Sequence, residues 1–370
     1  MTKRVLIIGA YGNFGSHITK KLAAEKDIQV IITGRSEEKC RGFAARFRDA
    51  LNPPEYKALD IGKDFLSSLH DIRPDIVIHT SGPFQGQGYG VAEACIEFGC
   101  HYIDLADGRD FVAQIGRLDR KAKEKGVTVI SGASSVPCLT SAVIDRYLPE
   151  YQKLTMIDYG ITTAQRTNTG PATTRAVLGY TGKPFKTSIN GKMQDVYGWQ
   201  NIALRKYPEL GYRLLSNCDI PDLELFPDRY PGIETIRFRA GLEISLLHLA
   251  LWKLSWLVRL RLLKSLEPLA AAMLKISRLF DGIGSDNSAF HMEMSGIDKE
   301  GKPKTAIFYL IAKSGHGPFI PSIPAILCAK MLARGDIKQT GAFPCTGIIR
   351  LEQYMEALQD LDVRPITVRK

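Results

Sequence analysis

The chain has 370 residues, which is too long for one ordinary domain and suits two, and 45% of its residues are hydrophobic, enough to fill two cores. Its 49 basic and 39 acidic side chains leave a net charge of +10, which favours anionic ligands, whereas the absence of a nucleic-acid-binding motif argues against a nucleic-acid partner. The seven cysteines are scattered without a Cys-x-x-Cys pair, so the pattern predicts free thiols in a reducing, cytoplasmic compartment and no metal site.

Residues 1–36 predict a βαβ unit. The apolar run 5–8 is followed by a turn with three glycines, by an amphipathic segment to Glu25 and by the β-branched run 28–33. This order and a size of about 30 residues are those of a dinucleotide-binding fold. Because the chain begins directly with a strand, we expect no secretory leader.

The turn reads Gly9-Ala-Tyr11-Gly12-Asn13-Phe14-Gly15. In a dinucleotide-binding turn Gly9 allows the tight exit from the strand, Gly12 lets the backbone approach a pyrophosphate, and Gly15 lets the helix pack on the sheet. The helix that begins near Asn13 points its free N–H groups at the phosphates. We therefore assign Gly9, Tyr11, Gly12, Asn13, Phe14 and Gly15 to a cofactor site. The simpler alternative is a tight turn in an α/β protein that binds no nucleotide.

The end of the second strand distinguishes NADP from NAD. Folds that bind NAD usually place an acidic residue there for the ribose 2′-hydroxyl, and such a carboxylate would repel a 2′-phosphate. This chain reads Thr33-Gly34-Arg35-Ser36, with Lys39 one turn into the next helix. A guanidinium can bind phosphate and stack on adenine, so the pattern favours NADP, with Arg35, Ser36 and Lys39 in the site. The alternative is that Arg35 is a solvated loop residue.

Strands and helices continue to alternate to about residue 132, which predicts a parallel, doubly wound sheet of the Rossmann type. Strands are expected at 56–59, 75–79, 100–104 and 127–130, and helices at 37–51, 91–98 and 109–125. Asp60 follows the first of these strands and could approach adenine or cap the next helix. Ser81, Gly82 and Pro83, in the loop after the strand 75–79, lie at the edge where open α/β sheets hold ligands. Asp107, in the loop after the strand 100–104, is also assigned to the cofactor site.

Three of these stretches together resemble the NADP-binding domain of the saccharopine dehydrogenase family. They are residues 9–15, the run Thr80 to Phe84, and the segment from Val91 to Asp107 that contains His101-Tyr-Ile-Asp-Leu-Ala-Asp107; the small residues 132–137 match the family's loop into the second domain. The likeness is strong over roughly the first 150 residues and loose beyond them. It implies a two-domain, NADP-dependent oxidoreductase and leaves the substrate open, because the family includes imine reductases, enoyl reductases acting on lipid-like chains and members of unassigned chemistry.

A second, α+β domain is expected at about 134–317, and the nucleotide domain at 1–133 and about 318–370. Strands at 153–163, 187–198, 232–239, 288–296 and 305–312 predict a mainly antiparallel sheet with helices on one face. Its exposed face is the expected surface of a homodimer. A helix at 171–179 could have Thr169 as its cap. The tail 363–368 is expected to add an edge strand to the nucleotide domain.

Residues 241–280 form a leucine-rich helical insert with six basic and two acidic side chains. Its densest apolar part, 244–258, contains His248 and Lys253 and is shorter than the ~20 apolar residues that a membrane span needs. We therefore predict helices that cover the sheet or a dimer interface. The alternative is a basic amphipathic hairpin that lies on a membrane and admits a hydrophobic substrate.

His316 stands in the run Lys313-Ser-Gly-His316-Gly-Pro318, where the chain is expected to return to the first domain. A histidine in such a loop can donate a proton to a hydride acceptor, because an imidazole ordinarily titrates near neutrality. His316 is therefore the expected catalytic acid. The alternative is a structural role, which is commoner for lone histidines.

Three functions are consistent with these patterns. The leading one is an NADP-dependent reductase of a small or lipid-like imine, carbonyl or enoyl substrate, in which the cofactor supplies hydride and His316 the proton. The second is a sensor or scaffold that binds NADP without turnover. The third is a peripheral, membrane-associated reductase of lipids.

Overall fold

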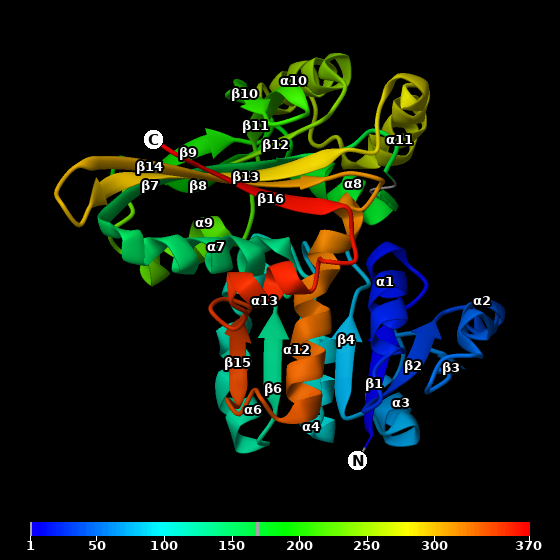
Figure 1. Ribbon diagram of the computed structural model, residues 1–370. Coiled ribbons are helices and arrows are strands. Elements are labelled where there is room, and N and C mark those ends of the chain that lie inside the picture. Colours follow the sequence, from blue (N-terminus) through cyan, green and yellow to red (C-terminus); the bar gives the residue numbers. More distant parts are fainter. Residues whose placement is uncertain (1, 168–169) are drawn as a thin grey trace. The chain divides into compact units, whose positions relative to one another are not determined.

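The computed structural model describes residues 2–167 and 170–370, and the chain divides into two compact units. Unit 1 comprises Met1–Leu139 and Phe319–Ile349, and unit 2 comprises Thr140–Pro318 and Arg350–Lys370. Each unit is built on a seven-stranded sheet of its own (Figure 1).

The sheet of unit 1 is parallel throughout. Its strands are β1 (Lys3–Ile8), β2 (Ile28–Gly34), β3 (Glu55–Ala58), β4 (Ile76–His79), β5 (His101–Asp104), β6 (Thr128–Ser131) and β15 (Gly341–Pro344), in the order β15-β6-β5-β4-β1-β2-β3. Val5, Leu6 and Ile7 are completely buried, because β1 lies inside the sheet and helices cover both faces. The doubly wound sheet expected from the sequence is confirmed.

Helices on both faces complete unit 1. They are α1 (Asn13–Leu22), α2 (Glu37–Ala44), α3 (Phe65–Ile72), α4 (Gly90–Phe98), α5 (Arg109–Ala113), α6 (Asp119–Glu124) and α12 (Ile323–Arg334). α1 contacts α12, and α3 contacts α4. Since α12 and β15 come from the C-terminal part of the chain, unit 1 is complete only after the chain has passed through unit 2.

The strand order places the turn after β1 beside the loop after β4. From β1 the chain continues to β2 and β3 on one side, and it then crosses to β4, β5 and β6 on the other. In open parallel sheets, ligands bind outside the carboxyl ends of the strands at such a reversal. Residues 9–15 and 80–83 follow β1 and β4 at this edge of the sheet.

The sheet of unit 2 is antiparallel except for one pair. Its strands are β7 (Tyr151–Thr162), β10 (Ala203–Tyr207), β11 (Gly211–Asn217), β12 (Thr235–Gly241), β13 (Ser288–Asp298), β14 (Pro303–Ala312) and β16 (Val363–Arg369), in the order β10-β11-β12-β7-β13-β14-β16. Only β7 and β12 run parallel. The mainly antiparallel second sheet expected from the sequence is confirmed.

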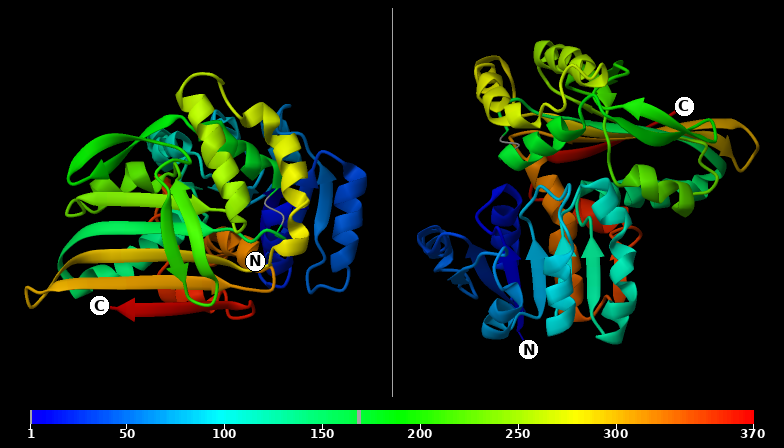
Figure 2. Two further views of the ribbon diagram at one scale, coloured as in Figure 1. Left: turned by 90° about the horizontal axis from the view of Figure 1, so that it is seen from above. Right: turned by 180° about the vertical axis from the view of Figure 1, so that it is seen from behind.

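Helices of unit 2 lie on both faces of its sheet. They are α7 (Thr140–Tyr147), α8 (Gly170–Tyr180), α9 (Asp222–Arg229), α10 (Ser245–Arg259), α11 (Ala270–Arg278) and α13 (Leu351–Glu356). α7 and α9 lie on one face, and α10 and α11 lie side by side on the other (Figures 1 and 2). The expectation of helices on one face is therefore wrong. The cap expected at Thr169 lies outside the described residues.

The region 187–198 is a hairpin and not one strand. β8 (Pro184–Ile189) and β9 (Lys192–Tyr197) pair antiparallel. Asn190 and Gly191 join them with φ angles of 52° and 73°. Positive φ at both central residues is typical of a type I′ turn, for which Asn-Gly is the preferred sequence, so the turn could have been recognised from the sequence.

One further expectation is wrong. The strand 363–368 does not join the nucleotide domain, because β16 pairs with β14 from Ala306↔Arg369 to Ala312↔Val363 and so covers an edge that β14 would otherwise expose. Residues 350–370 therefore belong to unit 2, and β15 forms the edge of the first sheet.

Candidate functional site

The turn after β1 is closed tightly by its glycines. Gly9 has a φ of +78°, and a Cβ there would lie 2.7 Å from Ser81 Oγ and 2.8 Å from Thr80 Oγ1. A Cβ on Gly15 would overlap the carbonyl oxygen of Gly9. Gly9 therefore permits the loop after β4 to approach the turn, and Gly15 permits α1 to lie directly against it.

The first turn of α1 is not capped by a side chain. Its N-cap is Gly12, which has an extended backbone, and no side chain among the described residues makes a cap hydrogen bond there. Gly12 and Asn13 are exposed and Phe14 is half-buried. The N–H groups at the start of a helix attract an anion, both as donors and through the helix dipole. This end of α1 therefore has the properties of a phosphate-binding site.

The end of β2 offers a cation and an aromatic ring. Thr33 is buried, and its hydroxyl donates to Ile7 O at 2.8 Å. The ring of Tyr11 lies across Gly34, since a Cβ on Gly34 would be 2.6 Å from the Tyr11 hydroxyl oxygen. Arg35 is exposed, and no described carboxylate forms an ion pair with it. With no acid at this strand end, a 2′-phosphate would meet a guanidinium and no repelling charge.

The other predicted adenosine contacts have local roles as well. Ser36 Oγ accepts from Lys39 N at 3.3 Å and so caps α2, while the ammonium end of Lys39 lies on the exposed side of this helix. Asp60 is exposed and accepts from Gly62 N at 3.0 Å. The cap of α3 is Asp64, so the capping alternative for Asp60 is wrong.

The loop after β4 is held by a residue that the sequence interpretation missed. Gln87 Nε2 donates to Ser81 O at 3.1 Å and to Pro83 O at 2.5 Å. At the start of the loop Thr80 Oγ1 donates to Ile8 O at 2.8 Å. Ser81, Gly82 and Pro83 are therefore fixed from both sides, each of them half-buried. A glutamine among glycines at residues 85–88 was the available signal.

Asp104, also missed, ties the loops after β5 and β6 together. Its completely buried carboxylate accepts from Ala106 N at 2.9 Å, Gly132 N at 2.8 Å and Ser131 Oγ at 3.0 Å. Burial raises the pKa of Asp104 to about 6, although these hydrogen bonds oppose the rise. The predicted Asp107 is half-buried and accepts from Gln85 Nε2 at 3.2 Å, and burial raises its pKa as well.

His316 belongs to unit 2 and follows β14. It is half-buried, and Asp362 N donates to its Nδ1 at 2.7 Å. A ring that accepts at Nδ1 is neutral and carries its hydrogen on Nε2. The contact with Asp362 N therefore sets which of the two ring nitrogens carries the hydrogen.

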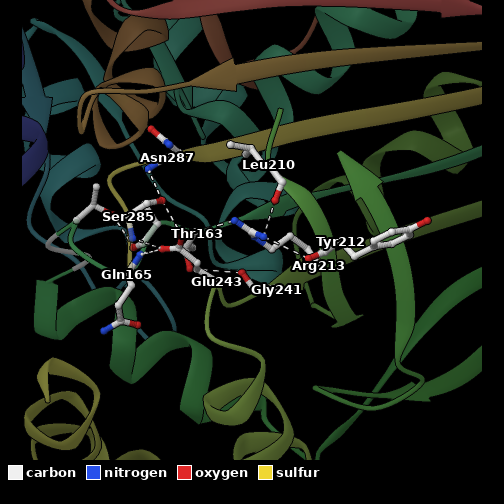
Figure 3. Close-up of polar contacts among 11 residues, drawn as sticks. Thr163, Gln165, Leu210, Tyr212, Arg213, Gly241, Glu243, Ser285 and Asn287 are labelled. Carbon is white, nitrogen blue, oxygen red and sulfur yellow. Dashed lines mark hydrogen bonds and ion pairs between the residues drawn. The ribbon is translucent and has the colours of Figure 1, made fainter. Parts of the chain in front are cut away.

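A second polar cluster lies in unit 2, where β7 and β12 end and β13 begins (Figure 3). The Glu243 carboxylate accepts from Gln165 N at 2.8 Å, Ser285 N at 2.9 Å and Ser285 Oγ at 2.6 Å, and Arg213 lies 3.5 Å away. Burial alone would raise the pKa of Glu243, but these donors and the guanidinium outweigh it and lower the pKa. The cluster joins three loops, and nothing in the sequence pattern indicated it.

The cysteines and acids form no metal centre in the described part of the chain. All seven cysteines are buried thiols that form no disulfide in the described part of the chain. No group of three or more His, Cys, Asp and Glu side chains among the described residues could hold a metal ion.

Comparison with known proteins finds a family match within the first unit. Residues 5–130 match the model of the saccharopine dehydrogenase NADP-binding domain. A saccharopine dehydrogenase-like oxidoreductase of Mus musculus is 28% identical over 151 residues, which are 36% of this chain and 35% of the relative. A lipid droplet localized protein of Caenorhabditis elegans is 26% identical over 143 residues, which are 36% of this chain and 34% of the relative. The aligned regions thus span about a third of these relatives.

The fold as a whole matches a solved structure. Apo saccharopine dehydrogenase (L-Glu forming) from Saccharomyces cerevisiae superimposes with a TM-score of 0.70 over 99% of this chain and 100% of the other, at 15% identity. That likeness shows the two-domain fold. Residues 5–130 thus resemble the NADP-binding domain of the saccharopine dehydrogenase family, and the whole chain shares the fold of the yeast enzyme.

Proposed function

We propose that the chain is an NADP(H)-dependent oxidoreductase that reduces a small or lipid-like imine, carbonyl or enoyl compound. The observation that supports this most is the uncapped start of α1, next to a strand end that carries Arg35 and no acid. The family of the first domain takes NADP, which agrees with this geometry. The name of the Caenorhabditis elegans relative supports the inclusion of lipid-like substrates.

NADPH bound at this site would supply a hydride from its nicotinamide ring. The chain's own residues would bind and orient the cofactor. Amides at the start of α1 would bind the diphosphate, Arg35 would bind the 2′-phosphate, and Ser81 to Pro83 would contact the nicotinamide ribose. Nε2–H of His316 would donate a hydrogen bond to the substrate atom that gains negative charge, and the proton that completes the reduction would come from water. A neutral imidazole serves this purpose, because a hydrogen-bond donor placed at a developing anion lowers the barrier.

Exchange of Arg35 for glutamate tests the cofactor assignment. We expect the variant to bind NADPH about 50-fold more weakly and NADH almost unchanged, because a charge-assisted contact to the 2′-phosphate contributes roughly 2 kcal/mol and NADH lacks that phosphate. Fluorescence titration of both cofactors measures this. Arg48→Glu is the matched control, since the Arg48 side chain is 83% exposed in the same unit. Equal losses for both cofactors would contradict the assignment of Arg35.

Exchange of His316 for glutamine tests the donor. We expect kcat to fall about 100-fold on any substrate that the wild type reduces, with an unchanged Kd for NADPH, because His316 acts on the substrate and not on the cofactor. The assay follows NADPH oxidation with imines formed from oxoacid and amine pairs, aldehydes and enoyl thioesters. An unchanged kcat would give His316 a structural role. Tight NADPH binding without oxidation by any of these compounds would instead support the sensor function.

The homodimer and the cytoplasmic location remain predictions. Analytical ultracentrifugation of the full chain over a range of concentrations tests the dimer. Fractionation of cells that express the chain tests the location.

A further inference from the structure

Helix α10 buries polar as well as apolar side chains. The inner side of the helix, which packs on the rest of unit 2, carries the buried residues His248, Leu251, Ser255 and Val258. Two of them are polar and engaged: His248 Nε2 lies 2.8 Å from Ser216 Oγ, and Gln200 Nε2 donates to Ser255 Oγ at 3.4 Å. A surface helix ordinarily places its apolar side on the protein and its polar side in water. α10 thus buries two polar side chains while apolar ones such as Leu246, 63% exposed, stay on its outer side.

The outer side of α10 and α11 is rich in large apolar side chains. Six of them, more than half exposed, define what we call the α10–α11 surface: Leu246, Leu260, Leu262, Ile276, Leu279 and Ile283. Leu279 is 80% exposed. Figures 1 and 2 show the two helices on the same face of the second sheet. Single exposed leucines are common, but such a concentration on two helices and the segments that directly follow them marks an interaction surface.

Local hydrogen bonds fix the segments that carry these apolar residues. After α10, the amides of Leu262 and Leu263 both donate to Leu257 O, at 2.8 and 3.1 Å. Between them and the helix, Arg261 has a φ of 61°, a region that L-residues other than glycine seldom adopt. On α11, Gln165 Nε2 donates to Ser277 O and to Asp281 Oδ1, each at 2.8 Å. The backbone that carries the α10–α11 surface is therefore fixed by hydrogen bonds.

Basic side chains surround the apolar ones. Lys253, Arg261, Lys264, Lys275 and Arg278 are exposed, and none of them forms an ion pair with a carboxylate in the described part of the chain. Arg259 stacks over Trp256 at 4.8 Å and over Tyr197 at 3.9 Å. A two-fold dimer through this surface would bring the same cations of both copies together, which costs free energy. An anionic surface would pair with them instead.

We propose that the α10–α11 surface docks on a membrane leaflet that contains anionic phospholipids. The exposed leucines and isoleucines enter the boundary between head groups and acyl chains, and the surrounding cations contact lipid phosphates. α10 has 15 residues and so a length of about 22 Å, less than the ~30 Å of a hydrocarbon core. None of the described helices is long and apolar enough to span a bilayer, so the helices lie in the plane of the interface. This inference does not depend on catalysis.

Sedimentation of the full chain with vesicles tests the proposal. The protein is expected to pellet with vesicles of phosphatidylcholine and phosphatidylserine at low salt, and at least about tenfold more weakly with phosphatidylcholine alone, because the cations then lose their partners. Trp256, 37% exposed, reports insertion through a blue shift of its fluorescence. The double variant Leu262→Glu and Leu279→Glu, and separately Arg261→Glu with Lys264→Glu, are each expected to reduce binding at least about tenfold.

Matched controls separate docking through this surface from nonspecific binding of exposed leucines to vesicles. Leu204→Glu and Leu51→Glu change leucines that are 64% and 62% exposed elsewhere on the chain, and they are expected to bind vesicles like the wild type. Circular dichroism checks that all variants keep the fold. Absence of pelleting at low salt, or undiminished pelleting of the Leu262 and Leu279 double variant, would overturn the proposal. The proposal would also be overturned if the wild type were a dimer, the Leu262 and Leu279 double variant were a monomer, and neither protein bound vesicles. The surface would then bind a second copy of the chain.

Discussion

Replacement of Gly15 by alanine is expected to abolish measurable NADPH binding and to lower the free energy of unfolding of unit 1 by roughly 3 kcal/mol. A Cβ at this position would overlap the carbonyl oxygen of Gly9 and lie 2.9 Å from Ala10 Cα. Both are backbone atoms, so no side chain can rotate away, and α1 must move off the turn. Such a movement displaces the amides at the start of α1, which are the proposed ligands of the diphosphate.

Gly42→Ala is the control for this experiment. Gly42 lies within α2, and a Cβ there would meet nothing within 4 Å. Alanine in a helix interior is preferred over glycine by about 0.5–1 kcal/mol, so this variant is expected to be slightly more stable and to bind NADPH like the wild type. Urea unfolding and fluorescence titration measure the two quantities. If Gly15→Ala bound NADPH normally, the close approach of α1 to the turn would not matter for the cofactor.

Replacement of Asp104 by alanine is expected to lower the free energy of unfolding of unit 1 by about 3–5 kcal/mol. The change leaves Ala106 N, Gly132 N and Ser131 Oγ without their shared acceptor in a completely buried place. Those donors fix the loops after β5 and β6. Asp104→Asn keeps one acceptor oxygen there and is expected to be much milder. Chemical denaturation of the three proteins measures the difference.

The pH dependence of stability gives a separate test of Asp104. Its pKa is raised from the ordinary 3.8 to about 6 in the folded chain. Between these values the folded state binds more protons than the unfolded one, so stability falls as the pH rises through this window. The stabilisation by the protonated acid is complete below pH 3.8 and lost above pH 6, and it amounts to roughly 3 kcal/mol. The Asp104→Asn variant should lack this pH-dependent contribution to the free energy of unfolding. Parallel pH profiles of wild type and Asp104→Asn between pH 4 and 7 would contradict the raised pKa.

Much of unit 1 was predictable because its signals are local. The glycine turn, the uncapped start of α1 and the cation at the end of β2 lie within residues 9–35, and neighbours along the chain create each of them. The alternation of strands and helices likewise predicts a parallel sheet, since a parallel pair needs a long crossover. The edge strand β15 escaped this reasoning, because its short run, Gly341–Pro344, shows no strand pattern until it pairs with β6.

The sequence by itself determined the nucleotide-binding half of this protein: its βαβ start, its glycine cradle and the preference for a phosphorylated ribose. Only the tertiary structure decided which sheet the last strand joins, that Asp104 and Glu243 are the acids that hold loops together, and which leucines of α10 stay exposed. The physical reason is the range of the interactions. A turn or a helix start depends on residues a few positions apart, whereas strand pairing, burial of a carboxylate and the orientation of a helix depend on partners that folding brings from distant parts of the chain.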